Sequence, residues 1–286
     1  MPFITFPAAG KLAGLAAMLE YLGYATDDRT IAREMEAPYL FAHENGYYRA
    51  GAQLYSPPWL NLYLHPRGYH MDAMTLPAED IPQQLRSLPT AMLSMRIAKA
   101  VRHPVVYLGY ESRRYRFSNI KRADSPEPDD FSLTSAMLKN RLEDTVTLYT
   151  LKQCPPCPVD FVPLLCNSLD VLKTYLHDLL AVRRKIVTLE ELQLLYEPLF
   201  RALMRDLLPL VPFLDDVRLA EELRYLQHDY RHIFTYNSPS AVHLSERLPK
   251  SSITLCLTWL YEDIVDRLYA LGADDALMAS RLSIFS

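Results

Sequence analysis

A proline-rich stretch at residues 152–164, KQCPPCPVDFVPL, separates two parts of the chain with different apolar patterns, and this change constrains the fold most. The first part contains short apolar runs that predict strands at residues 91–95, 105–108 and 146–151. The second part carries Leu and Tyr at helical spacing. It predicts helices at residues 168–184, 189–208, 215–234 and 251–270.

The expected fold class is therefore α+β followed by all-α. We predict a first domain over residues 1–151, in which a buried helix packs on an antiparallel sheet. Residues 152–164 are the predicted linker, because prolines at this density favour an extended chain. Residues 165–286 are predicted to form a helical bundle.

The first domain has a distinctive N-terminal helix, predicted at residues 10–22. No charge lies between Lys11 and Glu20, which indicates a helix buried on most sides. Gly23 is its predicted stop, and a second helix should begin after the polar residues 26–28.

The segments around these helices have weaker patterns. Residues 2–7 predict a short strand. Residues 37–75 are rich in aromatics and turn formers and predict short helical turns and loops. Residues 80–88 predict a small helix capped by Asp80.

Composition limits the class of protein. The chain has 286 residues, of which 50% are apolar and 22% charged, with a net charge of −4. These values are typical of a soluble globular protein and give no electrostatic reason to expect a nucleic-acid partner. The densest basic cluster, residues 113–122, is explained by a solvated hairpin loop as well as by an anionic partner.

The sequence also bears on compartment. It has no apolar run of the length that a membrane span needs, and its N-terminus lacks the pattern of a secretory signal. Its four cysteines do not suggest a disulfide framework. We therefore expect a cytoplasmic protein without a membrane span and without a cofactor.

Residues 101–119, VRHPVVYLGYESRRYRFSN, predict a hairpin with His103 at the start of one strand and Asn119 at the end of the next. The two side chains are expected to be neighbours at one edge of a sheet. A simpler interpretation makes His103 a strand-entry residue and Asn119 a turn former.

Three features resemble the papain-like cysteine peptidases, in particular the bacterial leader-peptide peptidases of bacteriocin exporters and the butirosin-type acyltransferases. The segment 15–24, LAAMLEYLGY, is similar to the first helix of that family, and the segment 103–110, HPVVYLGY, to its histidine strand. Asn119 stands where the family has the residue that orients the histidine. The resemblance covers roughly residues 1–150 and implies a papain-like fold.

The family's catalytic cysteine is missing at the matching position. A thiolate there would be favoured by the helix N-terminus and by the histidine. Counting back from Gly23 places the nucleophile at about residue 10, which is Gly10, and no cysteine precedes Cys154. Lys11 is a candidate substitute base or nucleophile, although a solvent-exposed lysine is the simpler interpretation. The nearby hydroxyls of Thr5 and Ser118 do not have the required position.

The cysteine pair Cys154 and Cys157 forms a C-x-x-C motif. A thioredoxin-type pair needs a helix N-terminus, and a zinc site needs two more ligands, for which Cys166 and His177 are candidates only by proximity in sequence. Because prolines surround the pair, a linker with two incidental thiols is the favoured interpretation.

Two pairs of histidines are candidate metal ligands. His228 and His232 have the i, i+4 spacing of a zinc helix, but they lie opposite the apolar stripe of their predicted helix. His65 and His70 flank a turn and are interpreted as surface residues. No metal site is predicted.

Three functions remain open on the sequence. The first is a catalytically inactive cysteine-peptidase-like protein, with His103 and Asn119 as vestigial site residues, that binds a peptide or protein partner through the former substrate cleft. The second is an active amide hydrolase or acyltransferase that uses Lys11 or another unconventional nucleophile. The third is an assembly protein that forms homo-oligomers through its C-terminal bundle.

Overall fold

The computed structural model describes residues 3–7, 9–98, 101–181, 190, 199–231 and 250–282. The chain forms two compact units, and neither is a single stretch of sequence. Unit 1 comprises residues 1–35 and 55–159, and unit 2 comprises residues 36–54 and 160–286. The mixed α+β class is confirmed, whereas residues 36–54 fall in a different unit from the one that the predicted boundaries imply.

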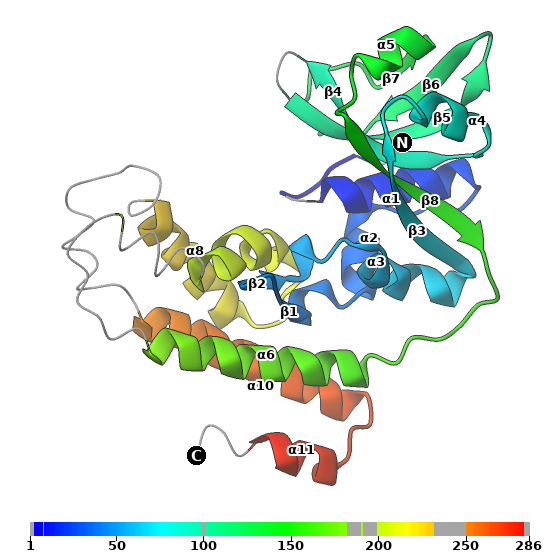
Figure 1. Ribbon diagram of the computed structural model, residues 1–286. Coiled ribbons are helices and arrows are strands. Elements are labelled where there is room, and N and C mark those ends of the chain that lie inside the picture. Colours follow the sequence, from blue (N-terminus) through cyan, green and yellow to red (C-terminus); the bar gives the residue numbers. More distant parts are fainter. Residues whose placement is uncertain are drawn as a thin grey trace. The chain divides into compact units, whose positions relative to one another are not determined.

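Unit 1 is built on a six-stranded antiparallel sheet (Figure 1). In spatial order the strands are β3 (Tyr69–Pro77), β8 (Thr145–Gln153), β4 (Ala91–Ala98), β5 (Val101–Glu111), β6 (Arg114–Asn119) and β7 (Asp130–Leu133). The strands predicted at residues 91–95, 105–108 and 146–151 are all present in longer form. β8 and β4 share one paired position, Tyr149 with Met92, whereas β3 and β8 pair over their whole length.

Helix α1 (Gly10–Tyr21) covers one face of this sheet. Leu12 to Leu19 are all buried, as the uncharged stretch predicts. Gly14 lies so close to Met92 that an added Cβ would come within 2.3 Å of its sulfur. Gly23 ends the helix at φ +90°, and the Tyr24 N–H donates to the Leu19 carbonyl, which is the predicted glycine stop.

The other face of the sheet holds the main apolar core of unit 1. Helices α4 (Ile81–Arg86) and α5 (Ser135–Lys139) lie over this face (Figure 1). The fully buried side chains of α4 and α5 that contribute to it are Ile81, Leu85 and Leu138. From the strands, residues such as Leu93, Val105, Tyr107 and Phe117 complete the cluster.

The remaining helices of unit 1 are α2 (Asp28–Glu34), α3 (Pro57–Leu64) and the 3-10 turn η3 (His65–Arg67). Asp27 caps α2 as predicted, since its side chain accepts from the Thr30 N–H at 2.7 Å. Asp80 was predicted to cap α4, but its side chain makes no capping bond. The predicted strand at residues 2–7 is absent from the described residues 3–7, where Ile4 makes one backbone bond to Lys121.

Unit 2 combines a β-hairpin with helices. The hairpin is β1 (Phe41–Glu44) and β2 (Tyr47–Ala50), flanked by the 3-10 turns η1 (Ala37–Tyr39) and η2 (Gly51–Gln53). The helical elements are α6 (Val162–Ala181), the π-helical turn η4 (Ala202–Leu207), the 3-10 turn η5 (Leu208–Phe213), α8 (Val217–Tyr230), α10 (Lys250–Ala270) and α11 (Asp275–Leu282).

The short helical turns predicted for residues 37–75 are present as η1, η2, α3 and η3, but the prediction missed the strands β1 and β2 and the start of β3. The hairpin turn is formed by Asn45 and Gly46, both at positive φ (53° and 78°). Asn-Gly is the residue pair that a tight hairpin turn prefers, so the local signal was present in the sequence. The aromatic and turn-forming residues around this pair favour a prediction of loops instead.

The predicted helix boundaries in unit 2 also shift. α6 begins at Val162 rather than residue 168, because Pro163 fits a first helical turn and Asp160 accepts from the Val162 N–H at 3.0 Å. The predicted helix 189–208 ends in the π-helical turn η4 and continues as 3-10 structure, and most of its first half lies outside the described residues. The described helices include none that is long and apolar enough to cross a membrane.

Side-chain bonds explain why residues 36–54 belong to unit 2. The Phe41 N–H donates to the Ser168 hydroxyl of α6 at 2.9 Å, and the Tyr48 hydroxyl donates to Asp178 of the same helix at 2.5 Å. Arg267 of α10 donates to Glu36 and to Asp215, each at 2.5 Å. The bonds to Glu36, Phe41 and Tyr48 attach the segment to helices that follow it by more than a hundred residues.

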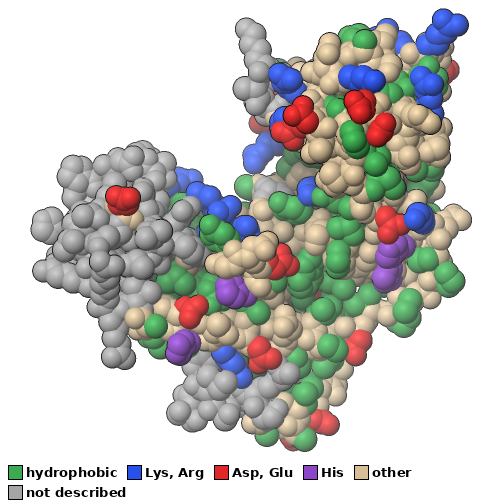
Figure 2. All heavy atoms as spheres, in the orientation of Figure 1, with side chains coloured by type: hydrophobic (Ala, Val, Ile, Leu, Met, Phe, Trp, Pro, Cys, Tyr) green, Lys and Arg blue, Asp and Glu red, His purple; other side chains and the backbone are tan. Residues whose placement is uncertain are grey.

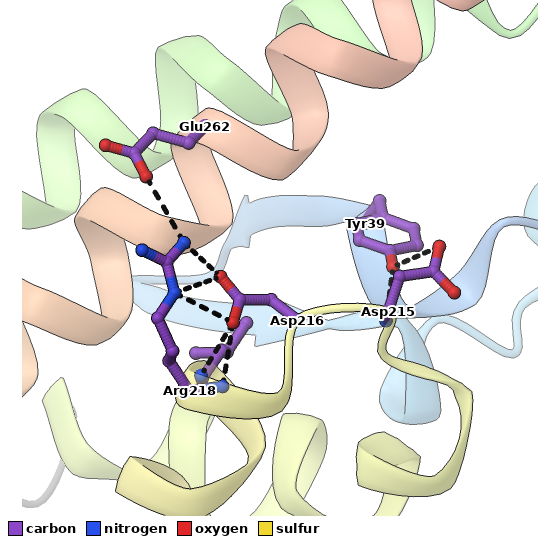
Figure 3. A network of polar contacts seen from close by, with 6 residues as sticks. Tyr39, Asp215, Asp216, Arg218 and Glu262 are labelled. Atoms are coloured by element: carbon purple, nitrogen blue, oxygen red, sulfur yellow. Dashed lines mark hydrogen bonds and ion pairs between the residues drawn. The ribbon is translucent and has the colours of Figure 1, made fainter.

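Figure 3 shows how the loop before α8 joins this arrangement. The Asp215 N–H donates to the Tyr39 hydroxyl at 3.2 Å. The neighbouring Asp216 caps α8 by accepting from the Arg218 N–H at 2.7 Å. The Arg218 guanidinium pairs with Asp216 at 2.6 Å and with Glu262 of α10 at 3.8 Å.

Gly51 should be essential to unit 2. A Cβ at this position would lie 1.7 Å from the Ala37 carbonyl oxygen, which belongs to the backbone of η1. We expect Gly51→Ala to lower the free energy of unfolding by at least ~3 kcal/mol, measured by urea denaturation. Gly272→Ala is the matched control, because Gly272 has φ +86° and open space around it, so only backbone strain of about 1 kcal/mol is expected. Equal effects of the two substitutions would contradict the close approach.

Asp206 should make the stability of unit 2 fall with rising pH. Its side chain is 1% exposed, and burial raises its pKa from 3.8 to about 7. Between these values the folded protein binds more protons than the unfolded chain, so stability is greatest at the acidic end and is lost as pH rises toward 7. We expect Asp206→Asn to remove this slope and to stabilise the protein by on the order of 2–4 kcal/mol at pH 8. Glu221→Gln, at an exposed position of α8, should leave the slope unchanged.

Candidate functional site

His103 lies on β5, between β4 and β6. His103 is paired with Met95 of the neighbouring strand β4. Two residues further along β5, on the same face of the sheet, Val105 is paired with Asn119 of β6. Because side chains alternate along a strand, His103 and Asn119 belong to the same face of the sheet, as the hairpin pattern predicts. This is the face that α4 and α5 cover.

A third residue, Glu127, joins the two. His103 Nδ1 lies 3.6 Å from Glu127 Oε2, and Asn119 Nδ2 donates to the same oxygen at 3.2 Å and to the Pro128 carbonyl at 3.2 Å. The carboxylate therefore takes the place next to the imidazole that was expected for Asn119. Asn119 is buried, and its Oδ1 has no hydrogen-bond partner among the described residues.

The loop that carries Glu127 is fixed by Lys121. The Lys121 ammonium donates to the carbonyls of Ser125 (3.1 Å) and Glu127, and it pairs with Asp129 at 2.8 Å. Residues 121–130, KRADSPEPDD, have the composition of a surface loop. Nothing local to that sequence shows that one of its acidic residues turns back toward His103.

Gly10 does not face His103. A Cβ at Gly10 would lie 3.2 Å from Pro104 Cγ and 3.7 Å from Ile4 Cδ1. Pro104 follows His103 directly in β5, so its side chain points to the opposite face of the sheet. The structure thus brings His103 and Asn119 together and places Gly10 on the other side of the strand.

Lys11 is the sequence-predicted residue with the most unusual environment. Its ammonium donates to the Tyr149 hydroxyl at 2.7 Å and lies 3.9 Å from the ring centroid of Tyr55 and 4.7 Å from that of Tyr149. The expected solvent-exposed lysine is therefore partly buried, and its burial lowers its pKa. Among the described residues no carboxylate pairs with it, so the two aromatic rings replace a counter-ion.

Tyr149 and Tyr55 could not be linked to Lys11 from the sequence. Tyr149 faces α1 because it pairs with Met92, which contacts Gly14 of that helix. Burial raises the pKa of Tyr149, so its phenol stays protonated while it accepts from Lys11. The Thr5 hydroxyl, another candidate, is occupied because it donates to the buried Asp28 at 2.7 Å.

The C-x-x-C motif lies beside two histidines in unit 1. The Cys157 N–H donates to the His65 carbonyl at 2.9 Å, and the Cys154 N–H donates to the Gly68 carbonyl at 2.9 Å. The imidazoles of His65 and His70 are hydrogen-bonded at 2.9 Å, and His70 reaches Asp72 at 3.2 Å. In the part of the chain that the structure describes, no three such side chains are arranged to hold a metal ion. His232, the second histidine of the other pair, lies outside the described residues.

Comparisons with known proteins do not identify the chain. No protein-family model matches it, and a search of curated proteins finds no match.

A cysteine at position 10 tests the geometry around His103. We expect the Gly10→Cys thiol to show the same alkylation rate at each pH whether His103 is present or replaced by alanine, because its Cβ would face Pro104. The helix N-terminus alone can lower its pKa below the ordinary value of about 8.5 in both backgrounds. A pKa that rises when His103→Ala is added would show that residues 10 and 103 form a papain-like pair.

Proposed function

We propose that this chain is a catalytically inactive protein of the papain-like type that binds a peptide or protein partner, and that Lys11 receives a carboxylate of that partner. The observation that carries the proposal is the Lys11 ammonium, which is partly buried against Tyr55 and Tyr149 and has no carboxylate partner among the described residues. A cation in this state has lost part of its hydration without gaining an opposite charge. An incoming carboxylate would provide that charge.

The position of Lys11 supports the former substrate cleft as the binding surface. It stands one residue after Gly10, the position that the resemblance assigns to the nucleophile. It also lies in the first turn of α1, whose N-terminus has no side-chain cap, so the helix dipole adds to the attraction for an anion. The tyrosines that surround the amine have the amphipathic character common in peptide-binding surfaces.

The surroundings of His103 support a catalytically inactive protein. Its bonded neighbour is Glu127, and the side chain that would project from position 10 points at Pro104 instead. An acyl-transfer site needs the nucleophile and its base within hydrogen-bond reach of one another. Glycine at position 10 provides no nucleophilic atom.

Binding can be tested with two peptide pools and thermal denaturation. The first pool contains random pentapeptides that lack Asp and Glu and have free carboxyl termini, and the second contains the same peptides with amidated termini. We expect the first pool to raise the melting temperature by on the order of 2 °C and the second to have no effect, because a ligand that binds the native state stabilises it. Lys11→Met should abolish the difference between the pools.

Lys139→Met is the matched control, since Lys139 lies in α5 of the same unit and is exposed. This variant should respond to the peptides as the parent does. Equal shifts with both pools, or a shift that survives Lys11→Met, would refute the carboxylate site.

One observation favours an enzyme as the second candidate. Burial lowers the pKa of Lys11, which increases the fraction of neutral amine, the form that can act as a base or nucleophile. The same incubations separate the two functions by mass spectrometry of the recovered peptides. A binding protein returns them unchanged, whereas an amide hydrolase that depends on Lys11 returns shortened products only with the parent chain.

A further inference from the structure

Two arginines of unit 2 share one tyrosine. Arg49 of β2 and Arg201, the residue directly before η4, each place the guanidinium carbon 5.5 Å from the ring centroid of Tyr47. Tyr47 is 39% exposed, and Arg49 and Arg201 are partly exposed. Residues from the hairpin and from a helical segment about 150 positions later thus form one small cluster.

Neither of these arginines forms an ion pair with a described residue. In the described residues, no carboxylate lies within ion-pair distance of Arg49 or Arg201, and Arg201 Nε is a buried donor without an acceptor. An unused buried donor on a charged group is costly, because it has lost its water and gained no partner. A bound acceptor would remove that cost.

The nearest acidic group is a poor counter-ion. Asp206 is buried, and its carboxylate accepts a long hydrogen bond from the Ala50 N–H at 3.4 Å. The positive charges of Arg49, Arg201 and Arg205 act on this carboxylate. Burial nevertheless raises its pKa to about 7, so the neutral form of Asp206 is populated at neutral pH. The two guanidinium groups of Arg49 and Arg201 therefore have one partly protonated carboxyl near them, so a surplus of positive charge remains on this pair.

Figure 2 shows several Lys and Arg side chains close together over unit 2, with acidic side chains at other places on the same unit. Arg205 of η4 lies nearby in the chain, and its Nε donates to the Tyr230 hydroxyl at 3.0 Å.

We propose that Arg49 and Arg201, which both lie beside the Tyr47 ring, form a binding site for a phosphate dianion. Two planar guanidinium groups offer more donors than one carboxylate can accept, whereas a phosphate presents at least three oxygens and a second negative charge. The ring holds both cations in place by cation–π attraction without neutralising them. The chemistry recognised is the phosphate group itself, whether free or carried as a monoester.

The site should be tested by calorimetric titration of the whole chain with inorganic phosphate at pH 8 and low salt. We expect Arg49→Gln and Arg201→Gln each to weaken phosphate binding at least ~10-fold, since a charge-assisted contact is lost. Arg33→Gln removes the same charge from an exposed position of α2 and should leave the affinity unchanged. Thermal denaturation of each variant shows that it is folded.

A gain of affinity provides the second test. At pH 8 Asp206 is mostly ionised and repels the anion, so Asp206→Asn should tighten phosphate binding by a few-fold. This outcome cannot result from damage to the fold. No phosphate binding by the parent chain, or equal affinities for the parent and both arginine variants, would overturn the proposal.

The source of the phosphate is separated by two more probes. O-phosphoserine and vesicles of phosphatidylcholine with phosphatidic acid carry the same group as a soluble monoester and as a lipid headgroup. Binding of any of the three probes that depends on Arg49 and Arg201 supports the site. The probe that binds most tightly identifies whether the phosphate is free, a soluble monoester or a lipid headgroup. Binding that is insensitive to both arginines would contradict it.

Discussion

Unit 2 depends on the capture of a short hairpin by helices that follow it in the sequence by more than a hundred residues. An isolated two-stranded hairpin is at best marginally stable, so β1 and β2 need partners. They obtain them from α6 through Ser168 and Asp178 and from η4 through Asp206. Stacking adds to these bonds, since the Tyr48 ring lies 4.4 Å from the buried Tyr175 ring of α6. The chain therefore enters unit 2 at residues 36–54, returns to unit 1 for residues 55–159, and only then continues into the helices of unit 2.

This long-range capture limits what the sequence could predict about the fold. The ends of α1 and the cap of α2 depend on residues within a few positions, and these were predicted correctly. The strands of unit 1 were also found, because their apolar runs are local. The grouping of residues 36–54 with the C-terminal helices depends on pairs such as Arg267 with Glu36, which no local pattern contains. The hairpin itself had a local signal in Asn45-Gly46, and its neighbouring aromatics hid that signal.

The candidate site was predictable to the same extent. Strand pairing places His103 and Asn119 on one face, as the spacing of the two residues suggested. The register also separates them from Gly10, because Pro104 rather than His103 is the neighbour of the first turn of α1. Glu127 and Tyr149 were missed for a physical reason. A loop carboxylate that folds back, or a phenol that meets an amine from a distant helix, is fixed by tertiary packing and leaves no periodic trace.

Lys11 in unit 1 and the arginines of unit 2 follow one electrostatic principle. Each cation lies against aromatic rings and lacks a carboxylate in ion-pair contact among the described residues. An ion pair would satisfy these groups and cancel the field that they present, whereas a π face stabilises a cation and leaves its charge available. By contrast, Arg267 also lies over a tyrosine, 3.7 Å from the Tyr39 centroid, but it is paired with Glu36 and Asp215 and serves to hold the fold together. Within the described residues, Arg267 is in ion-pair contact with carboxylates and Lys11, Arg49 and Arg201 are not, and this contact distinguishes a structural cation from one that can bind a ligand.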